Sequence, residues 1–265
     1  MVWLTGMLTT IHSRFTHGMQ GLGQITLLAL EALSSLGRRR WDVSNVLYQV
    51  YFIGIKSLSV VLITGAFTGM VLCAQTFFQF HKVGMDTATL AVVSISMCSE
   101  LGPVLSGLMV AGRVGAAIAA ELGTMKVTEQ IDALRALATH PVDYLVVPRV
   151  IATTLAVPLL TVCSICVGIG AAYYVGVFLL GIDRAYAWHN MIHYSSIEDV
   201  VMGLIKSFVF GAVISLVGCY KGLNCQQGAE GVGKATTEAV VFSSITILIS
   251  NFFLTLLLTR IFVQH

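Results

Sequence analysis

Charged residues are scarce in this sequence. Only 11% of the 265 residues are Asp, Glu, Lys or Arg, whereas soluble domains carry about 25%. Hydrophobic residues make up 56% of the chain, which is more apolar surface than a water-soluble globule hides. The lipid bilayer must therefore be part of the solvent, and we expect an all-α integral membrane protein.

Several functional signatures are also missing. The formal net charge is only +2, and no basic block alternates with aromatic residues, so we expect no nucleic-acid partner. The six cysteines are scattered and lie mostly in apolar runs, which argues against a disulfide framework. The sequence contains neither HExxH nor GxSxG. We therefore nominate no catalytic set, no metal site and no cofactor in this chain.

One glycine-rich segment comes close to a nucleotide-binding loop. Residues 228–236 read GAEGVGKAT and satisfy the GxxxxGK spacing, but Ala235 stands where the motif needs Ser or Thr to hold magnesium. No buried strand precedes the segment. We interpret it as a flexible loop in which Thr236 or Thr237 caps the helix that follows.

Five apolar stretches are long enough to cross a bilayer, because each exceeds the roughly 20 residues that a spanning helix needs. They cover approximately residues 49–78, 88–118, 150–181, 199–220 and 238–262.

A shorter apolar segment precedes these five spans. Residues 22–36 are interrupted by Gln24 and Glu31 and are followed by three arginines, 38–40. This profile is typical of an interfacial or shallowly re-entrant helix; a sixth full span is the weaker alternative. No Pro/Gly/Ser-rich linker divides the chain. We expect one domain over 1–265, with an N-terminal interfacial region (1–45) and a five-span core (46–265).

Basic residues predict the orientation of the spans. Arginines and lysines gather before the first span and in the connections 119–149 and 221–237. The connections 79–87 and 182–198 carry few. By the positive-inside rule the first group is cytoplasmic. An odd number of spans then places the N-terminus in the cytoplasm and the C-terminus on the outer side.

Small residues recur at helical spacing inside the spans. Gly107, Ala111, Gly115 and Ala119 repeat every four residues, and Gly65 and Gly69 do the same in the first span. Such spacing lets helix backbones approach closely. We expect most of these residues to pack inside the chain, although a share of them would suit a dimer seam.

Several polar side chains lie within the apolar runs. Glu100 and Lys206 fall inside the second and fourth spans, and Asn251 lies deep in the fifth. An ionisable group at membrane depth costs several kcal/mol unless it is paired or wetted. Each therefore faces a polar cavity or finds a partner. Lys56 and Arg113 lie closer to the cytoplasmic ends, where snorkelling satisfies them.

Residues 124–138 form a charged segment between two apolar spans. Val127, Ile131, Leu134 and Ala138 recur at helical spacing and define one apolar face. We predict a short cytoplasmic helix. It is either a solvated connector or a coupling helix that docks into a groove of a separate motor protein. The residues assigned to coupling are Lys126, Glu129, Ile131, Asp132, Leu134 and Arg135.

The sequence at this point resembles a known family. The run ELGPVLSGLMVAGRVGAAIAAELGTMKVTEQIDAL, followed by HPVDYLVVPRVIA, is similar to permeases of the MlaE/YrbE type. These are membrane subunits of ABC transporters associated with MCE proteins. LIKSFVFG and GVGKATTEAVVFSS are further matches, and the resemblance covers about residues 45–262.

The resemblance implies a transport complex. Two copies of the chain would form a homodimer in the inner membrane of a Gram-negative bacterium. Each would dock, through 124–138, a cytoplasmic ATPase resembling MlaF that binds ATP and Mg. A STAS-domain protein resembling MlaB would bind the ATPase, and a periplasmic MCE hexamer resembling MlaD would sit on the other side. The complex would move phospholipid between the inner and outer membranes.

The resemblance also assigns roles to residues. Glu100 and Lys206 match charged membrane positions of the family, although Ser99 stands where some relatives have Arg, and Asn251 replaces an acidic residue seen in some relatives. The lipid cavity would lie near the outer ends of the first and fifth spans. Its expected residues are Leu72, Gln75, Gln79, Phe80, Val83 and Asn251.

Two other functions fit the same sequence. An ion-coupled secondary transporter would use Glu100 and Lys206 as its relay, and would run on a proton gradient without an ATPase. A structural membrane anchor for periplasmic MCE proteins would tolerate substitutions throughout the cavity.

Overall fold

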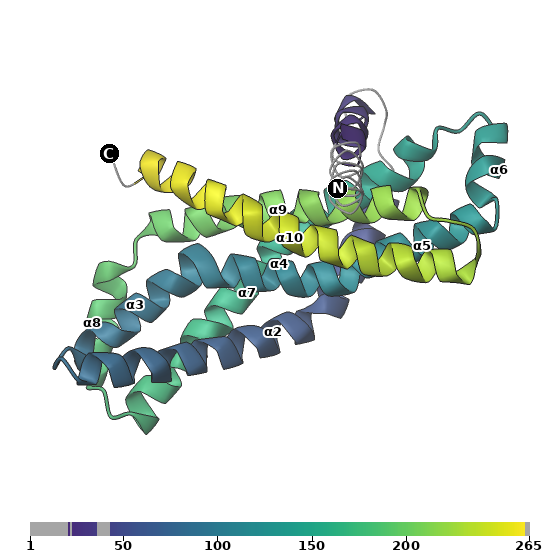
Figure 1. Cartoon of the computed structure of the whole chain (residues 1–265). Coiled ribbons are helices and arrows are strands. Elements are labelled where there is room, and N and C mark those ends of the chain that lie inside the picture. Colours follow the sequence, from purple (N-terminus) through teal and green to yellow (C-terminus); the bar gives the residue numbers. More distant parts are fainter. Residues whose placement is uncertain (1–20, 22, 36–42, 263–265) are drawn as a thin grey trace, which may run out of the picture.

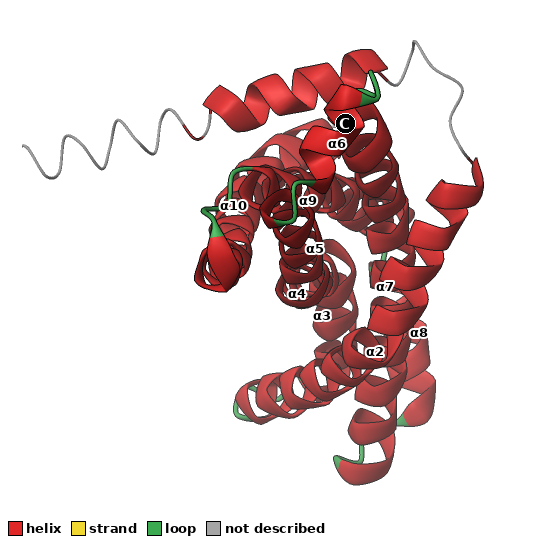
Figure 2. Ribbon diagram, turned by 90° about the vertical axis from the view of Figure 1, so that its right-hand side faces the viewer, coloured by secondary structure: helices red, strands yellow, loops and turns green. Residues whose placement is uncertain are grey.

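The chain folds into long helices that run side by side (Figures 1 and 2). A computed structural model describes residues 21, 23–35 and 43–262, and no strand occurs among them. The arginines 38–40, which follow the predicted N-terminal helix, lie outside this described part. Five helical segments within it are long and apolar enough to cross a membrane, so the predicted fold class is confirmed. They are Ser44–His81, Asp86–Val127, Val142–Leu179, Ile197–Leu223 and Gly228–Phe262.

Three spans are single α-helices, and two are interrupted by π-turns, in which each N–H bonds to the carbonyl five residues back. The single helices are α2 (Val43–His81), α9 (Ile197–Leu223) and α10 (Gly228–Phe262). The second span comprises η1 (Asp86–Ala88), α3 (Thr89–Ser96), the π-turn η2 (Met97–Leu101), α4 (Gly102–Val110), the π-turn η3 (Ala111–Gly115) and α5 (Ala116–Val127). The third comprises the π-turn η4 (Val142–Val146), α7 (Val147–Tyr174) and the π-turn η5 (Val175–Leu179).

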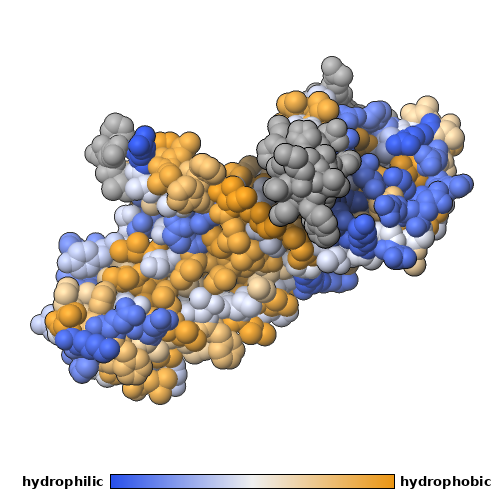
Figure 3. Space-filling model, in the orientation of Figure 1, coloured by the Kyte–Doolittle hydropathy of each residue, from blue (hydrophilic) through white to orange (hydrophobic). Residues whose placement is uncertain are grey.

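The connections gather at the two ends of the bundle. At one end α8 (Arg184–Tyr194) lies beside η1, and the Asn190 side chain donates to the Thr87 carbonyl at 2.9 Å. At the other end the Lys126 ammonium donates to the Leu223 carbonyl at 2.7 Å, which joins the second span to the end of α9. Hydrophilic side chains gather at both ends, where they mix with apolar ones, and a mainly hydrophobic band lies between them (Figure 3). This grouping of connections is the one that the sequence predicts.

The N-terminal helix, residues 23–35, crosses the ends of the spans and does not run along them (Figures 1 and 2). Tyr220 donates to the Gln24 side chain at 2.6 Å, and Ser35 donates to the Asp143 carboxylate at 2.5 Å. The leucines on its other face are exposed, with Leu27 at 66%. This placement fits a helix lying in the membrane interface and does not fit a sixth span.

The glycine segment 228–236 is helical, so the predicted loop is wrong. It forms the first turns of α10, and Gly231 packs so tightly against the Gln226 backbone that no side chain fits there. The hydroxyls of Thr236 and Thr237 donate to the Gly233 carbonyl within the helix, at 2.6 and 3.1 Å. They do not cap its start.

Small residues hold the spans in direct backbone contact. A Cβ added at Gly65 would collide with Ser164, and one at Gly69 would collide with the carbonyl of Gly168, so α2 and α7 touch backbone to backbone. The interpretation of these residues as packing within the chain is confirmed. Gly112 differs, because no atom outside its own helix lies within 4 Å of its Cβ position.

Candidate functional site

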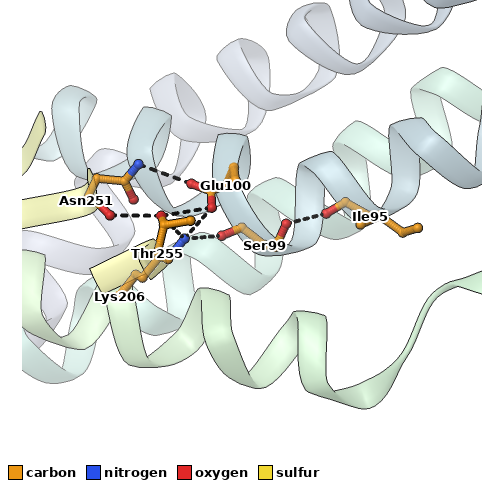
Figure 4. A network of polar contacts seen from close by, with 6 residues as sticks. All are labelled: Ile95, Ser99, Glu100, Lys206, Asn251 and Thr255. Carbon is orange, nitrogen blue, oxygen red and sulfur yellow. Dashed lines mark hydrogen bonds and ion pairs between the residues drawn. The ribbon is translucent and has the colours of Figure 1, made fainter. Parts of the chain in front are cut away.

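Polar side chains from three spans meet inside the apolar bundle (Figure 4). Ser99 and Glu100 come from η2, Lys206 from α9, and Asn251 and Thr255 from α10. We call these five residues the polar cluster. The structure thus answers a question that the sequence leaves open, because Glu100 and Lys206 contact each other directly.

Lys206 is the buried charge of the polar cluster, with 1% of its side chain exposed. Its Nζ lies 2.6 Å from Glu100 Oε1, 2.9 Å from Thr255 Oγ1 and 3.0 Å from the Ser99 carbonyl. An ammonium has three donors, so each finds an acceptor. A buried lysine persists only under such conditions, because an unpaired charge in an apolar interior costs several kcal/mol.

Glu100 receives donors on both carboxylate oxygens. Thr255 Oγ1 lies 3.0 Å from Oε1, and Asn251 Nδ2 donates to Oε2 at 3.1 Å. The Thr255 hydroxyl has one proton, and the carbonyl of Asn251 also lies within reach at 2.8 Å, so the two acceptors share it. The Asn251 Oδ1 atom is buried and has no hydrogen-bond partner among the described residues.

The local sequence explains why Lys206 binds here. In an α-helix the Ser99 carbonyl would accept from the N–H four residues later, which belongs to Pro103, and proline has no N–H. The Lys206 ammonium supplies a donor to that carbonyl instead. The close approach of α9 depends on Gly203, because a Cβ at that position would collide with the Cys98 carbonyl. Pro103 and Gly203 together make room for the polar cluster.

An apolar groove of about 350 Å³ lies along α2, and Leu101, the residue after Glu100, forms part of its wall. We call it the outer groove; it is lined by Phe67, Thr68, Val71, Leu72, Gln75 and Leu101. The structure therefore places two of the predicted cavity residues, Leu72 and Gln75, in one groove.

The other predicted cavity residues lie elsewhere. Gln79 and Phe80 follow one turn later on α2, and Val83 lies in the turn after this helix and is 67% exposed. Asn251 contributes to the polar cluster and does not line the outer groove. The lipid-contacting role of these residues stays a prediction.

The predicted coupling helix, 124–138, is not one helix. α5 continues to Val127, the backbone reverses at Glu129 with a φ of 59°, and α6 follows over Gln130–Ala136. Lys126 therefore belongs to the end of the second span. A left-handed residue breaks a helix even where the apolar spacing continues across the break, which is why periodicity missed it.

The short helix α6 keeps the amphipathic character that the sequence predicts. Ile131 is 2% exposed and Leu134 packs against the same core. Asp132 and Arg135 pair with each other at 2.9 Å on the outer face, where their side chains are about two-thirds exposed. Figure 1 shows α6 projecting from the end of the bundle, where a soluble protein can reach it.

Comparison with known proteins gives consistent matches. The family described as Permease MlaE matches residues 46–257. A probable ABC transporter permease protein of Rickettsia felis is 43% identical over 97% of this chain and its own full length. One from Synechocystis is 45% identical over 81% of each chain. The chloroplastic protein trigalactosyldiacylglycerol 1 of Arabidopsis thaliana is 40% identical over 88% of this chain and 64% of its own length.

Proposed function

This chain belongs to the MlaE permease family of ABC transporters, and on that basis we propose that it moves phospholipid between the inner and outer membranes of a Gram-negative cell. The observation that carries the proposal is the outer groove, an apolar recess in the spanning part of α2 whose lining also includes the polar residues Thr68 and Gln75. Apolar walls suit acyl chains, and polar groups beside them suit a headgroup. The Arabidopsis relative, whose name refers to a glycerolipid, supports a lipid substrate.

The second part of the proposal is a homodimer in the inner membrane. Two outer grooves, each lined by α2 and Leu101, would face each other and enclose the lipid. The end that carries α6 would lie in the cytoplasm, in agreement with the basic residues, and the C-terminus would lie in the periplasm. An MCE hexamer resembling MlaD would receive or deliver lipid there.

The third part is the source of energy. An ABC permease works with an ATPase partner, and here we propose an ATPase resembling MlaF, which binds ATP and Mg and carries a STAS-domain protein resembling MlaB. The permease itself offers no nucleotide loop at 228–236, since that segment is helical. The exposed face of α6 would fit a groove of the ATPase, and the buried Ile131 would transmit its movement to the spans.

A double substitution in the coupling segment tests this proposal. Glu129→Lys with Arg135→Glu, both at exposed positions of the segment, is expected to reduce co-purification of the ATPase by about tenfold or more, as loss of a central interface contact does. Lipid-stimulated ATP hydrolysis should fall with it. The measurement is pull-down of the tagged permease, followed by ATP turnover with phospholipid present.

The matched control is Glu198→Lys, another exposed acidic residue near the start of a helix but at the opposite end of the bundle. It should leave ATPase binding unchanged. Normal binding and normal lipid-linked turnover in the double variant would refute the coupling role.

The same assay separates the alternatives. An ion-coupled secondary transporter would move lipid on a proton gradient without the ATPase, and a structural anchor would move none. ABC family membership favours ATP-driven transport over both.

A further inference from the structure

A second groove lies between α2 and α5, toward the end of the bundle that carries α6. Its volume is about 560 Å³, which falls within the range of small-molecule sites. Tyr48 and Phe52 provide aromatic walls, and Gln49 and Thr124 provide polar atoms. We call it the inner groove; its full lining is Tyr48, Gln49, Phe52, Ala117, Ala120, Glu121, Thr124 and Met125.

Two cations adjoin the inner groove. Lys56 lies one turn beyond Phe52 on α2, and its Nζ is 4.3 Å from the centre of the Phe52 ring, so the ammonium leans back over the groove wall. Arg113 lies one turn before Ala117 on the opposite wall, and its Nη1 donates to the Ser57 hydroxyl at 2.5 Å. Both helices therefore direct positive charge to the same region.

These two charges have no counter-charge in the described part of the chain. No carboxylate there lies within 4.0 Å of the Lys56 or Arg113 nitrogens. Glu121, the acidic residue of the inner groove, already pairs with Arg149 at 3.1 Å. The groove and its border thus carry an excess of two positive charges.

Arg113 lies in the π-turn η3, well inside the second helical span. More than three helical turns, roughly 20 Å, separate it from the end of α5 at Val127. A charge at this depth costs several kcal/mol unless an anion or water compensates it. One serine hydroxyl is a neutral acceptor and leaves the guanidinium charge uncompensated.

We propose that the inner groove binds an anionic phospholipid of the adjacent leaflet. Its phosphate lies between Lys56 and Arg113, where a guanidinium offers the paired donors that phosphate accepts. The headgroup points toward Gln49 and Thr124, and the acyl chains run over the apolar surface of α2, where Ile63 is 59% exposed. This site is separate from the outer groove, and its occupancy does not depend on the proposed transport.

Lipid binding to the purified full-length protein tests the site. The protein in non-ionic detergent is incubated with dioleoylphosphatidylglycerol, with dioleoylphosphatidylcholine or with inorganic phosphate, and bound molecules are counted by native mass spectrometry. Because the outer groove would hold either lipid, more phosphatidylglycerol than phosphatidylcholine is expected to stay bound, and the excess reports the inner groove. Lys56→Met and Arg113→Gln should each weaken the retention of this excess by about tenfold or more, since each removes a charge-assisted contact. Lys82→Met, just after the opposite end of α2, is the matched control and should retain the excess lipid.

A third variant keeps both cations and closes the groove. Ala120→Leu fills the space between α2 and α5 and should also abolish the excess retention of phosphatidylglycerol, which keeps the test valid if removal of a cation prevents folding. Three results would overturn the proposal: equal retention of phosphatidylcholine, binding of inorganic phosphate alone, or full retention by Ala120→Leu. A fourth result would also overturn it: Lys56→Met or Arg113→Gln changes the mass of the protein assembly but not the amount of bound lipid. A second copy of the chain would then supply the anion.

Discussion

Glu100→Gln is expected to destabilise the protein by about 3–5 kcal/mol, the range found when one partner of a buried ion pair is removed. The reason is the difference in burial between the partners. Lys206 is 1% exposed, whereas Glu100 is 35% exposed. Loss of the carboxylate leaves a buried ammonium facing only neutral acceptors, the Ser99 carbonyl and the Thr255 hydroxyl.

Lys206→Met should be milder, at about 1–3 kcal/mol. The remaining Glu100 carboxylate still accepts hydrogen bonds from Asn251 and Thr255. It is also partly exposed, so its charge is less costly than a fully buried one. The double variant should lose less than the sum of the two single losses, because the pair interacts. The measurement is thermal unfolding in detergent. If Lys206→Met lost as much stability as Glu100→Gln, or more, then the difference in burial would not explain how much each partner contributes.

Gly69→Ala is expected to lower stability by roughly 1–3 kcal/mol or more, because it forces a methyl group into the backbone of another helix. The Cβ would collide with the Gly168 carbonyl of α7, and neither helix has a flexible side chain that can move aside. α2 and α7 must then separate along the outer half of the bundle. The same detergent unfolding experiment measures the effect.

Gly54→Ala is the matched control in the same helix. No atom outside the helix lies within 4 Å of its Cβ position, so the added methyl group meets no collision. Alanine loses less backbone entropy on folding than glycine does, so the change should stabilise the protein slightly, by about 0.5–1 kcal/mol. Equal responses of the two variants would contradict the backbone contact between α2 and α7.

The sequence predicts the architecture well because the bilayer imposes a simple requirement. A spanning helix needs a long apolar run, and four of the five predicted runs lie within a helical segment of the structure. The third run, 150–181, ends two residues after its segment, which stops at Leu179. The ends of the helices are less predictable. α10 begins at Gly228, ten residues before the predicted apolar run at 238. Its first turns are rich in glycine, which suggests a loop from composition, but Gly231 packs closely against the Gln226 backbone there.

The candidate site is predicted only in part. Glu100 and Lys206 are visible as charges in apolar runs, and their depth alone predicts partners. Thr255 gives no such signal, because a threonine in a membrane helix ordinarily bonds to the carbonyl four residues back, as this one also does with Asn251. Its spacing of four from Asn251 was the available hint. The missing N–H of Pro103 is visible in the sequence. That Lys206 of α9 donates to the Ser99 carbonyl in its place is visible only in the structure.

The way α10 is held has a mechanical consequence. Its inner part is fixed by small buried residues such as Ala239 and Ser243, but beyond Ile247 the buried residue is Leu258 alone. Between these two, Asn251 and Thr255 fasten the helix to Glu100 by hydrogen bonds. Water can replace hydrogen bonds but cannot replace apolar packing. The last third of α10 therefore depends on these hydrogen bonds more than the rest of the helix does, so wetting of the polar cluster would loosen this part of α10 first.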